Sequence, residues 1–266
     1  MFAITKSYLV AETLEQALDE LLKSKSNAIL GGCMWLRQGH KTIGTAIDLS
    51  ALGLDQITLS GDTVDIGCMA TLRDLERSPF MTGGLQILPR SVASIVGTQF
   101  RNTATVGGSV YSRFGFSDLM TALLALDSHV HLFKGGVIPM SEFIRQPKKR
   151  DIVVNVSVKL HETCRTSYQS LRLSASDFPV LSLAVAKTGA AWTISVGARP
   201  GPAMLALKAA KGLTDCPSEL EIERAAGILS EELNFGSNMR GSAEYRRHVS
   251  KVLFRRAAGE ILGVQA

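Results

Sequence analysis

Several patterns that mark common classes of protein are missing from this chain of 266 residues. Its four cysteines form no Cys-x-x-Cys pair, which excludes the usual spacing of a zinc or iron–sulfur site. No glycine has another glycine two positions later, so the Rossmann dinucleotide fingerprint is absent. No apolar run approaches the length of a membrane span, and the N-terminus lacks the pattern of a secretion signal. We therefore expect a cytoplasmic protein with no membrane partner.

The chain also has no large excess of positive or negative charge. The 29 Lys and Arg residues exceed the 24 Asp and Glu residues by only five, and the basic residues are dispersed. They cluster only at Lys148–Arg150, Arg246-Arg247 and Arg255-Arg256, with no basic stripe interleaved with aromatic residues. Nucleic-acid binding is therefore disfavoured, and we interpret these clusters as solvated surface charge.

Motifs for side-chain catalysis are incomplete. Gly39 and Gly44 have the spacing of a phosphate-binding P-loop, but Thr45 stands where the lysine belongs. No nucleophile-elbow pattern surrounds the serines near Asp118, which disfavours a hydrolase. His129 and His131 would share one face of a strand, yet no third metal ligand is near in the sequence. The sequence thus predicts neither catalytic side chains nor a metal site.

The apolar patterns predict an α+β fold in two parts. Short strands and helices alternate through the first part, which ends with an alternating strand over residues 152–160. Three strands, near 167–173, 180–186 and 191–197, precede three helices near 203–210, 218–233 and 242–262. Strands followed by helices favour a small separate α+β domain. We place the boundary between residues 1–162 and 163–266.

What the chain does contain is an unusual central stretch. Residues 99–109 combine a basic residue, an amide, two threonines and the pair Gly107-Gly108, and lead to Asp118. A second pair, Gly31-Gly32, follows the apolar run 28–30. Glycine pairs let backbone N–H groups approach an anion, so the two pairs together could hold the two phosphates of a dinucleotide. Gly31-Gly32 alone is more typical of a tight turn and Gly107-Gly108 alone is equally compatible with one, but a turn does not require the whole stretch from residue 99 to Asp118.

These residues resemble those of the FAD-binding (medium) subunit of the xanthine dehydrogenase and carbon monoxide dehydrogenase family of molybdenum hydroxylases. The resemblance extends over almost the whole chain, and its most specific part is the central motif. Its segments are residues 29–32, 66–76, 97–108, 117–118, 123–127, 167–172 and 242–247.

The resemblance implies a two-part FAD-binding domain of the vanillyl alcohol oxidase and carbon monoxide dehydrogenase flavoprotein type, followed by the small C-terminal domain of that flavoprotein. It implies one pyrophosphate-binding and ribose-binding segment: Ile29, Leu30, Gly31, Gly32, Cys33, Met34 and Trp35. The residues that it implies for the other side of the pyrophosphate and the ribityl chain are Thr105, Gly107, Gly108 and Ser112. Asp118 would accept hydrogen bonds from cofactor hydroxyl groups, and Phe178 would lie near the isoalloxazine ring. Ile95 and Tyr111 complete the expected FAD site.

By the same resemblance, a partner large subunit carries molybdopterin and a partner small subunit carries iron–sulfur clusters. Electrons would pass through FAD in this chain to NAD+ or another acceptor. The chain departs from the family pattern at Cys33, Trp35, Ser109 and residues 113–116. Two alternatives stay open: a docking subunit that has lost its flavin, and a self-contained flavin oxidoreductase.

Overall fold

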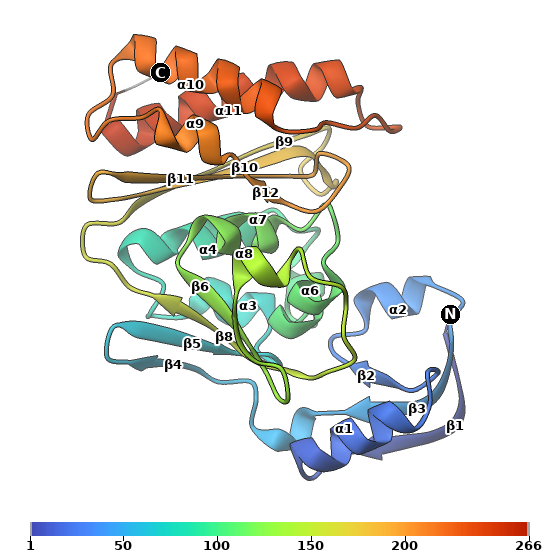
Figure 1. Cartoon of the computed structure of the whole chain (residues 1–266). Coiled ribbons are helices and arrows are strands. Elements are labelled where there is room, and N and C mark those ends of the chain that lie inside the picture. The colour runs from blue at the N-terminus through green and yellow to red at the C-terminus, as the bar shows by residue number, and fades with distance from the viewer. Residues whose placement is uncertain (1, 265–266) are drawn as a thin grey trace.

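The computed structural model describes residues 2–264, which form three sheets arranged in layers with helices (Figure 1). The smallest sheet stands apart from the main body at the N-terminal end, with its strands in the order β1-β3-β2. All of its pairings are parallel. Its elements are β1 (Ala3–Val10), α1 (Leu14–Lys23), β2 (Ala28–Leu30), α2 (Met34–Gln38) and β3 (Thr42–Asp48).

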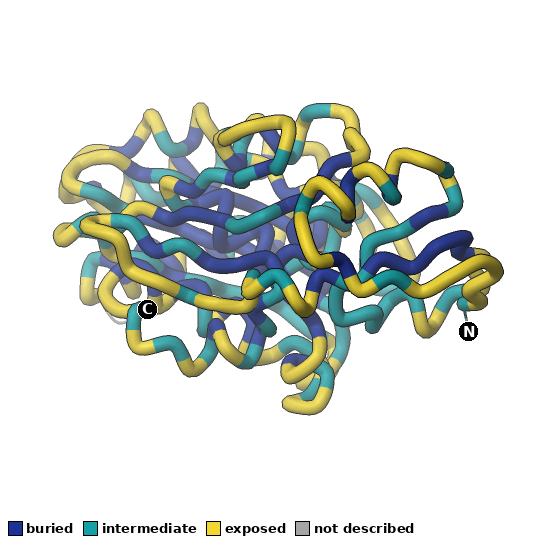
Figure 2. The backbone as a smooth tube through the Cα atoms, turned by 90° about the horizontal axis from the view of Figure 1, so that it is seen from below, coloured by how far each residue is buried: buried dark blue, intermediate teal, exposed yellow. Residues whose placement is uncertain are grey.

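Helix α1 begins after Thr13, because the Thr13 hydroxyl caps it by accepting a hydrogen bond from the N–H of Gln16. Ala17, Leu18 and Leu21 point into the core, while the strand β1 at the edge of the sheet is almost fully exposed. In Figure 2 the buried positions accordingly run along the interior strands, and the exposed positions lie at the rim and in the loops.

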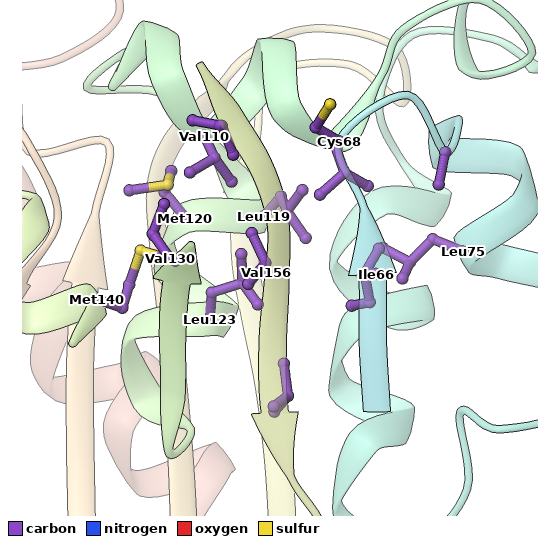
Figure 3. Close-up of a cluster of buried hydrophobic side chains, with 14 of the residues drawn as sticks. Ile66, Cys68, Leu75, Val110, Leu119, Met120, Leu123, Val130, Met140 and Val156 are labelled. Atoms are coloured by element: carbon purple, nitrogen blue, oxygen red, sulfur yellow. The ribbon is translucent and has the colours of Figure 1, made fainter. Parts of the chain in front are cut away.

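The second sheet has five strands in the order β4-β5-β8-β6-β7, with antiparallel pairings. Short helices pack on it, and its core includes Ile66, Leu119, Val130 and Val156 (Figure 3). Its strands are β4 (Ile57–Ser60), β5 (Thr63–Gly67), β6 (Ser128–Leu132), β7 (Gly136–Pro139) and β8 (Val153–Lys159). The helices of this part are α3 (Leu72–Arg77), α4 (Ile87–Ala93), α5 (Thr98–Arg101), α6 (Val106–Ser112), α7 (Asp118–Ala125) and α8 (Met140–Phe143).

The third sheet, β12-β11-β10-β9, lies between two layers of helices (Figure 1). Alternate residues of β10 serve the two layers, since Leu181 and Leu183 pack toward the C-terminal helices while Ala184 and Ala186 join the first core. Its elements are β9 (Arg165–Arg172), β10 (Pro179–Thr188), β11 (Ala191–Gly197), β12 (Met204–Leu205), α9 (Leu207–Lys211), α10 (Glu219–Glu232) and α11 (Ala243–Leu262).

The predicted elements are largely found, with one correction. The helix expected over 203–210 is wrong at its start, because Met204 and Leu205 pair with β11 as the strand β12 and the helix begins only at Leu207. The helix that ends at Ala93 is followed by a break, in which Val96 has a left-handed backbone with φ of 47°. The boundary at 162/163 falls in the connection between β8 and β9 and stays a prediction. No helix within residues 2–264 is long and apolar enough to cross a membrane.

Candidate functional site

A cavity of about 450 Å³ is lined by residues of the small sheet, the α5–α7 region and the loop between β9 and β10. All fifteen predicted site residues line it, from Ile29 in β2 to Phe178 in the second domain. The structure therefore brings together segments that are up to 149 positions apart in the chain. That these residues contact FAD remains a prediction.

The first glycine pair forms a bend whose backbone donors are unused. Strand β2 ends at Leu30, and Cys33 adopts a left-handed conformation with φ of 56° before α2 begins. Within residues 2–264, the N–H groups of Gly31, Gly32 and Cys33 donate to no protein acceptor. Consecutive N–H groups without partners in such a bend form a concave site suited to an anion.

The second glycine pair uses its donors within the protein. Thr105 caps α6 and accepts a hydrogen bond from the N–H of Gly108 at 3.2 Å. The N–H groups of Val106 and Gly107 donate to the carbonyl groups of Ala70 and Cys68, each at 2.8 Å. These bonds fasten the short helix α6 to the segment after β5, and the contact of this pair with phosphate stays a prediction.

The two bends nevertheless lie against each other. A Cβ atom added to Gly31 would lie 2.8 Å from Thr105 Oγ1 and 3.6 Å from Gly108 Cα. At Gly108 an added Cβ would meet only Thr105 Oγ1, at 3.0 Å, so further side-chain atoms there would extend into the cavity. The absence of side chains at these two positions lets the bends approach each other and leaves the cavity beside Gly108 open.

The other members of the pairs have a packing role. A Cβ atom on Gly32 would lie 1.8 Å from the carbonyl oxygen of Thr103, and one on Gly107 would lie 2.6 Å from the Cβ of Cys68. Backbone and β-carbon atoms cannot move away as a flexible side chain can. Gly32 and Gly107 are therefore required for the close approach of the two segments.

Arg101, which belongs to the central motif, supports the site without lining it. Its guanidinium donates to Glu76 Oε2 at 3.0 Å and to the carbonyl oxygen of Ile95 at 3.0 Å. Arg73 pairs with the same carboxylate. Burial raises the pKa of Glu76, but the bonds from the two arginines outweigh it and the pKa is lowered overall. Arg101 is thus present in the central motif for a structural reason, and the sequence alone did not predict this role.

Asp118 is engaged by the second domain. It begins α7, and its Oδ1 atom accepts hydrogen bonds from the Tyr168 hydroxyl and from Arg172 Nη2, the latter at 2.6 Å. Its side chain is only 5 % exposed. Burial raises the pKa of the Asp118 carboxyl, an effect that the charge of Arg172 partly offsets. Asp118 therefore joins the two domains at the cavity wall.

Five aromatic residues meet in one cluster. Trp35 lies at its centre, with its ring centroid 5.7, 5.3 and 5.4 Å from those of Phe114, Phe116 and Phe178 and 6.1 Å from that of Phe100. All five rings line the cavity. The five rings therefore form one packed surface, which a planar aromatic group could contact by edge or face.

Arg113 turns the chain toward Phe114 and Phe116 of this cluster, because it ends α6 in a left-handed conformation with φ of 49°. Of the non-glycine residues with a left-handed backbone in the described part of the chain, Cys33, Val96 and Arg113 lie in or beside the cavity wall, whereas Ala198 does not line it. Strain of this kind concentrates at functional sites in proteins.

The remaining predicted residues have ordinary contacts in the cavity wall. The Tyr111 hydroxyl donates to the carbonyl oxygen of Lys149 at 2.9 Å, and the Ser112 hydroxyl donates to that of Gly108 at 2.6 Å. Ile95 packs against the first core. Cys33 Sγ donates to the carbonyl oxygen of Gly31 at 3.2 Å, and burial raises the pKa of its thiol.

Basic residues that sequence reasoning assigned to the solvated surface also line the cavity. Lys148 donates from Nζ to the carbonyl oxygen of Ser112 at 2.7 Å, and burial lowers its pKa. Arg150 spans to the N-terminal part, where its guanidinium binds the carbonyl oxygens of Leu21 and Asn27. The adjacent pattern Lys-Lys-Arg was visible in the sequence, but only the fold places it beside the glycine bends. Together with the free N–H groups, these cations fit a diphosphate.

Neither histidine of β6 belongs to this site. His131 Nε2 lies 2.8 Å from Ser157 Oγ, and His129 faces Asp127 at 3.8 Å. Among the described residues, no three His, Cys, Asp or Glu side chains are placed to hold a metal ion together.

Residues 2–158 match the model of the FAD binding domain in molybdopterin dehydrogenase. Residues 166–261 match the CO dehydrogenase flavoprotein C-terminal domain. The chain belongs to the family of FAD-binding domains of molybdopterin dehydrogenases.

Similar proteins extend over nearly the whole chain. The glyceraldehyde dehydrogenase medium chain of Sulfolobus acidocaldarius is 26 % identical, with 96 % of this chain and 98 % of that protein covered. The uncharacterized protein YgfM of Escherichia coli is 26 % identical, with 91 % of each chain covered. The structure of reconstituted CO dehydrogenase from Oligotropha carboxidovorans superimposes with a TM-score of 0.91 at 21 % identity, covering 100 % of both chains.

These findings confirm the predicted fold class and the resemblance. The chain is a FAD-binding medium subunit of the molybdenum hydroxylase family and an oxidoreductase component, with FAD as its cofactor. The cavity fits that cofactor because Gly31 and Gly108 line it without side chains and the N–H groups of residues 31–33 beside it are unused.

Proposed function

We propose that this chain is the electron-transfer subunit of a three-component molybdenum hydroxylase. A partner large subunit oxidises the substrate at molybdopterin, and a partner small subunit passes the electrons on through iron–sulfur clusters. Bound FAD supplies the chemistry that accepts these electrons and releases them as pairs to NAD+ or another acceptor. We place this protein in the cytoplasm.

The observation that carries the proposal is the cavity between the two glycine bends. Free N–H groups at Gly31 to Cys33 bind the pyrophosphate, and the cations of Lys148 and Arg150 balance its charge. The hydroxyl proton of Thr105 is free to donate between the bends. The aromatic cluster around Trp35 contacts the flavin ring.

The first experiment measures flavin in the purified full chain by visible absorption, before and after incubation with FAD and removal of the excess. We expect bound FAD at one molecule per chain. No flavin band after this treatment would contradict the proposal and would favour a docking subunit in which the aromatic cluster fills the ring position.

The second experiment tests the electron path with the chain alone and with the proteins that copurify with it. We expect a molybdopterin protein and an iron–sulfur protein to copurify, and substrate electrons to reach the FAD only in their presence. Steady reduction of a small acceptor by NADH with the isolated chain would instead identify a self-contained flavin oxidoreductase.

A further inference from the structure

Arg172 has a buried hydrogen-bond donor with no partner. Its side chain, at the end of β9, is 9 % exposed. Nη1 donates to the carbonyl oxygen of Asp177 at 2.6 Å, and Nη2 donates to Asp118 Oδ1 at 2.6 Å. Its Nε atom is buried and makes no hydrogen bond with residues 2–264. The guanidinium is thus fixed at two corners while its third side lacks an acceptor.

This free donor is distinguished by its position. Six buried side-chain nitrogen or oxygen atoms in the described part of the chain lack a partner, and they belong to Arg73, Arg113, Asn155, Arg172, Ser195 and Arg240. Of these six residues only Arg172 lines the cavity. A buried donor without an acceptor is costly, so one that lies in a cavity wall is a candidate for a bond to a ligand atom.

The surroundings indicate which part of a ligand that atom belongs to. The second domain contributes four residues to the cavity lining: Arg172, Ser176, Asp177 and Phe178. Phe178 belongs to the aromatic cluster, with its ring centroid 4.6 Å from that of Phe116. Arginine can only donate, so the partner must be a hydrogen-bond acceptor on a group that also contacts aromatic rings.

We propose that Arg172 donates its Nε–H to a carbonyl oxygen or ring nitrogen of the flavin, and that Asp118 and Tyr168 are positioning residues that hold the guanidinium in place. This inference rests on the proposed function, because it requires the flavin ring to lie at the aromatic end of the cavity. Reduction increases the electron density on the flavin's carbonyl oxygens and ring nitrogens. A donor fixed there stabilises the reduced form and makes the reduction potential more positive.

The decisive variant is Arg172→Lys, which keeps a cation for Asp118 but removes Nε–H. We expect it to fold, to bind FAD about tenfold more weakly, and to show a more negative flavin reduction potential than the wild-type protein. ADP, which lacks the flavin ring, should bind the variant and the wild-type protein equally. The matched control is Arg199→Lys, because Arg199 is also a buried arginine that donates to backbone carbonyl oxygens, at 2.6 and 3.0 Å, but does not line the cavity. Its FAD affinity and potential should be unchanged.

An unchanged reduction potential in a folded, flavin-loaded Arg172→Lys protein would overturn the inference, as would an equal loss of ADP affinity. If that variant does not fold, the double variant Asp118→Asn with Arg172→Gln removes both charges together, and the same potential shift is expected. Failure of the wild-type chain to bind FAD would instead refute the proposed function. The two failures are therefore distinguishable.

Discussion

The two glycine pairs of this cavity are alike in sequence and opposite in use. At Gly31-Gly32 the bend after β2 leaves its N–H groups without protein acceptors. At Gly107-Gly108 the start of α6 donates its N–H groups to Cys68 and Thr105. One bend is therefore a binding surface, and the other is the wall that faces it.

Within each pair the two glycines also differ. Gly32 and Gly107 fit tightly against backbone or β-carbon atoms of another segment, whereas Gly31 and Gly108 border the gap between the bends. A glycine pair thus combines one residue needed for folding with one needed for binding. Substitutions at the two kinds of position should have separable effects.

The largest effect is expected for Gly32→Ala. The new Cβ would lie 1.8 Å from the carbonyl oxygen of Thr103, so the small sheet and the central segment could not pack. We expect a loss of more than about 4 kcal/mol of stability and little soluble protein. The control is Gly227→Ala in α10, where nothing lies within 4 Å of an added Cβ and a gain of roughly 0.5–1 kcal/mol is expected. Thermal unfolding of both proteins measures the difference, and equal stability would contradict the packing role.

Gly108→Val should separate binding from folding. Its Cβ would meet only the Thr105 hydroxyl, and the larger side chain would occupy the gap between the bends. We expect an unchanged far-ultraviolet circular dichroism spectrum and a loss of FAD affinity of about a hundredfold or more, roughly 3 kcal/mol. FAD titration followed by flavin fluorescence measures this. If the variant keeps wild-type affinity, the pyrophosphate does not lie between these bends.

A smaller effect is expected for Lys148→Gln, which tests whether the free N–H groups act with nearby cations. Loss of one partly buried cation should weaken FAD binding about five- to tenfold, roughly 1 kcal/mol, and make binding less dependent on salt. Lys149→Gln is the matched control, since Lys149 is the adjacent residue but does not line the cavity. Equal losses in the two variants would mean that only the overall charge matters.

The smallest effect concerns the support of the second bend. Arg73 and Arg101 lower the pKa of Glu76 below its ordinary value of 4.5. A carboxyl whose pKa is lower in the folded state stabilises the protein above the unfolded pKa, and this stability is lost as the pH falls through the folded pKa. Glu76→Gln should therefore cost about 1 kcal/mol at pH 7 and less at pH 3. Urea unfolding at both pH values measures this, and an equal cost at both would contradict it.

Much of the fold could be predicted from local patterns. The strand before Gly31, the alternation in β8 and the helices α10 and α11 follow from apolar spacing and from capping residues such as Ser218. The expected helix over 203–210 was wrong at its start because pairing with β11 overrides the helix preference of an alanine-rich run.

The candidate site was predictable only in part. The glycine pairs marked the cavity, and the family resemblance supplied the remaining predicted residues. The cavity-lining residues Lys148 and Arg150 and the unpaired Nε of Arg172 were missed. A charged residue has the same sequence signal whether it lies in solvent or at a cavity, so no local pattern separates the two cases.

By itself the sequence determined where the chain bends, because glycine and apolar spacing act over a few neighbouring residues. The tertiary structure decided which bend keeps its donors free, which glycines pack, and that Asp118 meets Arg172 across 54 positions. Such contacts depend on how whole sheets and helices are arranged, and this arrangement is set by the sum of many distant packing interactions.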